Sequence, residues 1–149
     1  MKMRRILLVG RSESGKTTLT QALRGMNVEY HKTQYINYHD VIIDTPGEYA
    51  ENKNLSQALA LYSYEADVIG LLISATENYS LFPPNIAPCV NREVIGIVTK
   101  IDDKEGDGYQ AESWLRLSGC EKVFHVSSVT GEGIQGLIHY LQTESDWRP

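Results

Sequence analysis

A glycine-rich segment near the start of the chain has the residue types and spacing of a phosphate-binding loop. It matches the pattern G-x-x-x-x-G-K-[ST] with Gly10, Arg11, Ser12, Glu13, Ser14, Gly15, Lys16 and Thr17. In such a loop, backbone N–H groups surround the phosphates, the lysine neutralises their outer oxygens and the threonine hydroxyl ligates Mg²⁺. Lys16 is therefore also a candidate catalytic residue. The predicted nucleotide-binding residues here are Gly10, Ser12, Glu13, Ser14, Gly15, Lys16, Thr17 and Thr18.

A second group of residues could hold the metal and the terminal phosphate. Asp44 follows an apolar run, and a carboxylate at a strand end can hold Mg²⁺ through water. The N–H of Gly47 could bind the γ-phosphate, and Thr33 could complete the Mg²⁺ shell when that phosphate is present. The predicted metal ligands are Thr17, Thr33 and Asp44, and Thr33 and Gly47 are catalytic candidates. The alternative is an ordinary turn at Asp44 and an ordinary loop threonine at Thr33.

The segment Thr99-Lys100-Ile101-Asp102 could recognise the base, because it follows a further apolar run. A carboxylate at Asp102 can accept two hydrogen bonds from guanine N1–H and N2–H₂, which adenine cannot supply. Lys100 would lay its aliphatic stem along the base. These residues favour GTP and GDP over ATP, whereas the alternative is a solvated charged loop over residues 100–105.

The elements that must position these residues alternate along the chain. Short apolar runs predict strands at residues 6–9, 41–43, 68–73, 94–98 and 123–126. Apolar residues at helical spacing predict helices at residues 17–24, 55–64, 110–117 and 134–141. We therefore expect a single α/β domain over residues 1–149, a three-layer sandwich with a mainly parallel sheet. Alternation over residues 35–38 adds one antiparallel edge strand.

Composition narrows the classes of partner. The chain has 149 residues and a formal net charge of -5, with no basic cluster long enough to follow a nucleic-acid backbone. No apolar stretch approaches the roughly 20 residues that span a bilayer. The sequence predicts a cytoplasmic protein, a monomer or weak dimer, that binds neither nucleic acid nor membrane. Cys89 and Cys120 lack CxxC spacing and are predicted to be reduced structural thiols.

These motifs, in this order, resemble those of the Ras-like and Era-like P-loop GTPases over nearly the whole chain. Ser127-Ser128-Val129 is similar to the loop that closes over the base in those proteins, with a backbone N–H near Ser128 meeting guanine O6. More narrowly, segments 31–34, 44–49 and 94–100 resemble the ethanolamine and propanediol utilisation proteins of the EutP/PduV type. That resemblance implies a bacterial protein tied to metabolic microcompartments, with a shell or enzyme protein as partner of its switch surface.

Three residues depart from the wider GTPase pattern. Thr99 stands where most GTPases have Asn, which removes about 1 kcal/mol of hydrogen bonding. Glu48, a catalytic candidate, stands where Ras-like enzymes carry the Gln that orients water. A carboxylate there would be repelled by the γ-phosphate, so we expect slow hydrolysis, unless Glu48 only caps a turn or faces solvent. Glu13 stands where cation-activated relatives have Asn, and K⁺ is a further candidate ligand of the site.

Three functions are compatible with these residues. The first is a slow Mg²⁺-dependent GTPase switch. The second is a small-molecule kinase that passes a γ-phosphoryl group to a metabolite such as a carboxylate. The third is an assembly or targeting module that binds nucleotide without useful turnover.

Overall fold

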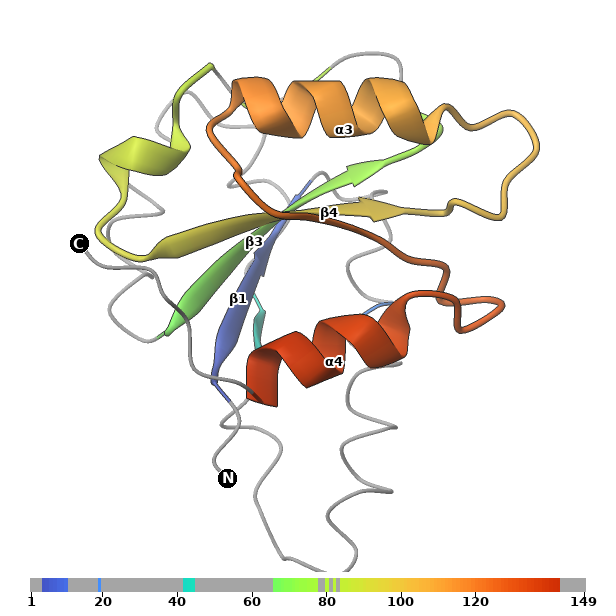
Figure 1. Cartoon of the computed structure of the whole chain (residues 1–149). Helices are drawn as coiled ribbons and strands as arrows, with labels where there is room; N and C mark the ends of the chain where they lie inside the picture. Colours follow the sequence, from blue (N-terminus) through green and yellow to red (C-terminus); the bar gives the residue numbers. More distant parts are fainter. Residues whose placement is uncertain are drawn as a thin grey trace, which may run out of the picture.

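The centre of the molecule is a five-stranded parallel sheet with a helix on each face (Figure 1). The computed structural model describes residues 4–10, 19, 42–44, 66–77, 80, 82 and 84–142. The strand order is β2-β1-β3-β4-β5, and every pairing is parallel. Helix α3 covers one face and α4 the other, which gives the three layers expected from the sequence.

Each strand lies where an apolar run predicts one. The strands are β1 (Ile6–Val9), β2 (Ile42–Asp44), β3 (Val68–Ser74), β4 (Glu93–Thr99) and β5 (Val123–His125). Their ends differ from the predicted ones by one residue at most. The predicted antiparallel strand at residues 35–38 lies outside the described residues.

Two α-helices and one short 3₁₀ helix are described. They are η3 (Ala87–Cys89), α3 (Gly108–Leu117) and α4 (Ile134–Gln142), and both α-helices agree with the helical spacing of the sequence. The predicted helix at residues 55–64 lies outside the described residues. Of the predicted helix at residues 17–24, only Leu19 is described. Within the described part of the chain, no helix has the length and apolar character needed to cross a membrane.

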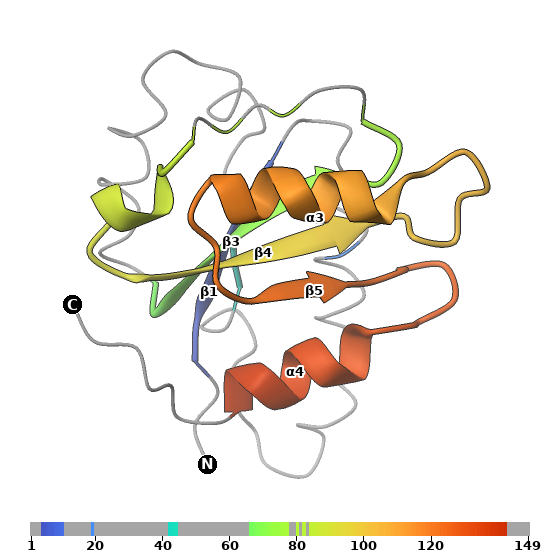
Figure 2. The same cartoon turned by 45° about the horizontal axis from the view of Figure 1, so that its top comes forward.

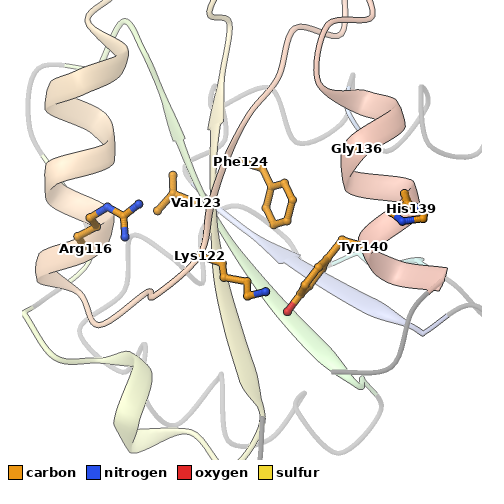
Figure 3. A pocket seen from close by; sticks show the side chains of 7 residues that line it. All are labelled: Arg116, Lys122, Val123, Phe124, Gly136, His139 and Tyr140. Carbon is orange, nitrogen blue, oxygen red and sulfur yellow. The ribbon is translucent and has the colours of Figure 1, made fainter. Parts of the chain in front are cut away.

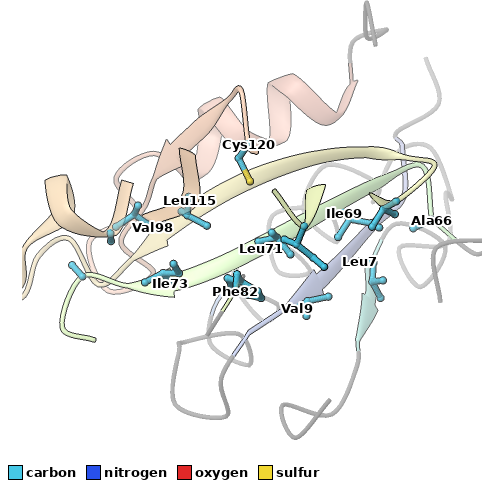
Figure 4. Close-up of a cluster of buried hydrophobic side chains, with 14 residues drawn as sticks. Leu7, Val9, Ala66, Ile69, Leu71, Ile73, Phe82, Val98, Leu115 and Cys120 are labelled. Carbon is cyan, nitrogen blue, oxygen red and sulfur yellow. The ribbon is translucent and has the colours of Figure 1, made fainter. Parts of the chain in front are cut away.

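The core consists of two apolar clusters, one on each face of the sheet, because alternate residues of a strand point to opposite faces. Figure 4 shows the cluster on the α3 face, which includes Leu7, Ile69, Leu71, Ile73, Val98 and Leu115. The cluster on the α4 face includes Ile6, Leu8, Val68, Ile95, Ile97 and Leu137. Each helix is therefore fixed to the sheet by its own apolar side.

Local sequence signals set the ends of α3 and its distance from the sheet. The Asp107 carboxylate accepts a hydrogen bond from the Gln110 N–H at 3.0 Å and caps the first turn. Gly119, at φ +103°, adopts the left-handed conformation that commonly follows a helix end. Under the middle of the helix, a Cβ on Gly96 would lie 2.9 Å from Leu115 Cδ1, so glycine permits this close approach.

An ion-pair network ties α4 to the amino end of the sheet. Arg4 Nη1 donates to Glu93 Oε1 at 2.7 Å, and the Tyr140 hydroxyl donates to the other carboxylate oxygen of Glu93. The Arg4 guanidinium also lies 4.7 Å from the centroid of the Tyr140 ring. Because Glu93 is buried, these partners offset the cost of removing its charge from water.

The Cys120 side chain is a free thiol in the core, as the sequence predicts. Burial raises the pKa of Cys120 to about 12, so the thiol stays protonated and unreactive. The side chain of Cys89 lies outside the described residues.

Replacement of Leu115 by alanine should destabilise the protein by about 2–5 kcal/mol, because it leaves a cavity between α3 and the sheet. The Leu115 side chain is 0% exposed, whereas Leu117 on the same helix is 62% exposed. Urea unfolding followed by circular dichroism measures the change, with Leu117→Ala as the matched control. Equal losses in the two variants would contradict this account of the α3 face.

Candidate nucleotide-binding site

The carboxyl ends of the five described parallel strands lie at one edge of the sheet, where open α/β sheets bind ligands. Strand register aligns Leu8 with Asp44, Ser74 with Thr99, and Val98 with His125. Figure 2 shows the loops after β4 and β5 at this same edge. Among the predicted site residues that the structure describes, Gly10 follows β1, Asp44 ends β2 and Thr99 ends β4.

The phosphate side of the site begins at Gly10, which is buried directly after β1. The backbone of Asp44 ends β2 and pairs with Leu8 of β1, two residues before Gly10. The remaining residues predicted to hold phosphate, metal or the attacking water lie outside the described residues: Ser12, Glu13, Ser14, Gly15, Lys16, Thr17, Thr18, Thr33, Gly47 and Glu48. The predicted metal ligands Thr17, Thr33 and Asp44 would supply two hydroxyls and a carboxylate, which are the hard oxygen donors that Mg²⁺ prefers.

The base side of the site is held by main-chain hydrogen bonds at the end of β4. The buried Thr99 accepts from the Ala75 N–H at 2.9 Å, and Ala75 in turn accepts from the Asp107 N–H at 2.6 Å. Lys100 has φ +59°, a left-handed conformation that is uncommon for a residue with a side chain. The strand therefore ends in a sharp turn that carries Asp102 to the surface of the edge.

The loop after β5 is organised around Ser127, which is fully buried. Its N–H donates to the Glu132 carbonyl at 2.9 Å, and its carbonyl accepts from the Gly131 N–H at 2.8 Å. Its hydroxyl oxygen accepts from the Thr130 N–H at 3.1 Å. These three bonds fix the position of the Ser127 hydroxyl.

That hydroxyl donates to Asp102 Oδ1 at 2.7 Å and joins the loops after β4 and β5. Oxygen acceptors on a carboxylate have two lone pairs each, so Asp102 can still receive two N–H donors from a ligand. The bond restricts the rotation of the carboxylate before any ligand arrives. The arrangement can therefore recognise a group with two adjacent N–H donors, as guanine presents.

A second network of polar side chains connects α3 to the end of β5, directly before the loop that contains Ser127. Glu112 on α3 accepts from Arg116 Nε at 2.8 Å, and its other oxygen lies 2.6 Å from His125 Nε2. Hydrogen bonds from His125 and then Arg116 lower the pKa of Glu112. Because His125 ends β5, two residues before Ser127, this network ties the base loop to α3.

The structure brings together the predicted base residues Thr99, Lys100, Asp102 and Ser127, with Ser128 and the exposed Val129 in the same loop. Sequence reasoning did not identify the Glu112 network. Helical spacing places Glu112 and Arg116 one turn apart, so the sequence could have predicted this ion pair. His125 is distant in sequence, and only the fold shows its contact with Glu112.

The parallel sheet and the P-loop motif that follows β1 in the sequence define an α/β P-loop nucleotide-binding protein. The chain belongs to the ethanolamine utilisation and propanediol utilisation family (PduV-EutP), whose family model matches residues 3–143. The narrower resemblance in the sequence is thereby confirmed.

Two relatives in this family cover almost the whole chain. The propanediol utilization protein PduV of Citrobacter freundii is 42% identical over 143 residues, which are 95% of each chain. The probable acetate kinase EutP of Escherichia coli (strain K12) is 31% identical over 142 residues, covering 93% of this chain and 89% of the relative.

Among solved structures, the G-domain of FeoB from Methanococcus jannaschii is similar, with a TM-score of 0.63. The match covers 95% of this chain and 97% of that one, at 22% sequence identity. This likeness confirms the P-loop NTPase fold.

Glu112→Gln should remove a pH-dependent part of the stability. The pKa of Glu112 is lowered from its ordinary value of 4.5 in the folded state, so its contribution is complete above that value and is lost as the pH falls through the folded pKa. Unfolding free energies from about pH 7 to about pH 3 should show a wild-type advantage that shrinks at the acid end. Glu121→Gln, at an exposed neighbouring carboxylate, is the control. A constant difference between wild type and Glu112→Gln across this range would contradict the role of the network.

Proposed function

We propose that the protein binds GTP and GDP with Mg²⁺ at the carboxyl edge of its sheet and hydrolyses GTP slowly, as a switch in ethanolamine or propanediol utilisation. The hydrogen bond from Ser127 to Asp102 carries this proposal, because it orients a carboxylate for the two N–H donors of guanine. An adenine base offers no such pair, so ATP would leave Asp102 without a partner.

The phosphate half of the proposal rests on residue types. Backbone N–H groups from Gly10 to Thr18 would surround the phosphates, and Lys16 would neutralise their outer oxygens. Thr17, Thr33 and Asp44 would hold Mg²⁺, which supplies charge neutralisation at the β- and γ-phosphate oxygens when bound.

GTP hydrolysis would be slow because of the Glu48 side chain. Glu48 can accept a hydrogen bond from the attacking water, but its charge opposes the γ-phosphate. We also propose that K⁺ binds beside Glu13. Equal rates of GTP hydrolysis in Na⁺ and K⁺ buffers would contradict this K⁺ site.

The cellular role follows from the switch. Contacts of Thr33 and Gly47 with the γ-phosphate would change on hydrolysis, so their surroundings would bind a partner in one state only. We place this partner among the shell or enzyme proteins of a bacterial microcompartment in the cytoplasm. The family membership supports this choice, because both named pathways are metabolic.

Calorimetric titration of nucleotide-free protein with GTP, GDP and ATP in Mg²⁺ tests the base assignment. We expect guanine nucleotides to bind more tightly than ATP, and Asp102→Ala to weaken guanine binding by at least about 100-fold, because two hydrogen bonds to a charged group are lost. Asp103→Asn, at the exposed neighbouring carboxylate, keeps an acceptor for the Glu105 N–H; it is the matched control and should bind GTP like wild type.

A kinase function is the second candidate, because a relative that covers 93% of this chain is named as a probable acetate kinase. In that reaction the γ-phosphoryl group passes to an acetate oxygen, which gives acetyl phosphate and a nucleoside diphosphate. ATP binding that is unaffected by Asp102→Ala, together with acetyl phosphate formed from ATP and acetate, would overturn the switch and establish the kinase.

A further inference from the structure

A hollow of about 520 Å³ crosses the outer edge of β5, between the end of α3 and the middle of α4 (Figure 3). Its lining includes Arg116, Lys122, Val123, Phe124, His139 and Tyr140. Lys122 and Val123 lie at the amino end of β5, whereas the base loop follows the carboxyl end. The hollow is therefore separate from the nucleotide site.

The rim of the hollow is basic in an otherwise acidic chain. Arg116 and Lys122 bring positive charges to it and His139 an imidazole, although the chain has a formal net charge of -5 with its histidines neutral. Within the described residues, Glu112 is the one carboxylate that pairs with any of these three, through Arg116. The Lys122 ammonium lies 4.9 Å from the centroid of the Tyr140 ring. This local charge favours an anionic partner.

The floor of the hollow is apolar and half exposed. Phe124 and Tyr140 place their ring centroids 5.2 Å apart, and Val123 lies toward α3 on the other side of the strand. All three side chains remain partly open to solvent. An apolar side chain of a partner could cover Phe124 and Tyr140, which lie on the same side of the strand.

The backbone of β5 offers hydrogen-bonding groups to the same space. The Lys122 carbonyl accepts from the Gly96 N–H, and the Val126 N–H donates to the Val98 carbonyl, each at 2.8 Å. Alternate residues of a parallel strand face the same neighbour, so the backbone groups of Val123 face away from β4. No strand in the described part of the chain pairs with this outer side. Such an edge is a template for an added strand.

The shape of the hollow favours an extended occupant over a small molecule. Small-molecule sites enclose most of their ligand. Here the lining side chains spread across the strand from α3 to α4 (Figure 3). A Cβ on Gly133 would lie 2.0 Å from the His125 carbonyl oxygen, so the loop before α4 covers the carboxyl end of the edge. Backbone pairing is thereby confined to the start of β5.

We propose that this edge docks an extended acidic segment of a partner protein. The backbone of the segment pairs with Val123, its acidic side chains reach Arg116 and Lys122, and an apolar side chain covers Phe124 and Tyr140. The Glu112 carboxylate holds the Arg116 guanidinium in place for this contact.

Fluorescence anisotropy with labelled peptides tests the proposal on the full chain. The probe is a hexapeptide of alternating glutamate and valine, and its lysine–valine counterpart is the reversed-charge control. We expect the acidic peptide to bind and the basic one not to bind. Lys122→Glu should weaken the acidic peptide by about tenfold or more, through like-charge repulsion. Lys104→Glu makes the same charge change in an exposed loop outside the hollow and should leave binding unchanged.

Val123→Pro tests the backbone pairing separately. It removes an N–H that faces away from β4, so the sheet should survive while peptide binding is lost. Thermal unfolding verifies the fold of each variant, and amide NMR shifts at Lys122 and Phe124 locate the peptide. The proposal would be overturned if the acidic and basic peptides bound equally. It would also be overturned if Lys104→Glu weakened binding of the acidic peptide as much as Lys122→Glu does. Shifts of these amides by acetate or phosphate alone, without peptide binding, would assign the hollow to a small anion and also overturn it.

Discussion

The hydrogen bond between the Ser127 hydroxyl and Asp102 Oδ1 is the constraint on which the candidate site depends. It joins two loops that follow adjacent strands, and it limits the rotation of a carboxylate at the surface. A carboxylate already held in place loses little conformational entropy when a ligand binds, so more of the hydrogen-bond energy appears as affinity. Without it, Asp102 would be one of several exposed acids in a charged loop.

The rest of the described structure serves to place these two groups. Parallel pairing aligns the carboxyl ends of β4 and β5, and the buried Ser127 is fixed by its own loop. Glu112 connects α3 to His125 at the end of β5, while Asp107 both caps α3 and bonds the turn after β3. The same helix therefore supports the base loop and contributes Arg116 to the basic edge of β5. The candidate nucleotide site and the basic edge both involve α3 and β5, but they lie at opposite ends of β5.

Much of this arrangement is predictable from local patterns. The apolar runs predict the five described strands, and the phosphate-loop motif and the motif at Asp102 place the candidate site at the carboxyl ends of those strands. The contact between Ser127 and Asp102 and the contact between Glu112 and His125 are not predictable in this way, because each joins residues distant in sequence. The basic hollow was also missed, since Arg116, Lys122 and His139 form no cluster along the chain.

The central claim, that Asp102 recognises the guanine base, is tested most directly by a variant that should prefer a different base. Asp102→Asn keeps the shape of the side chain but replaces an acceptor by an amide donor, which suits xanthine, whose C2 carries an oxygen in place of the amino group. Competition between GTP and XTP should therefore favour GTP in the wild type and XTP in Asp102→Asn. An unchanged preference in the variant would show that Asp102 does not contact the base, and would contradict the account.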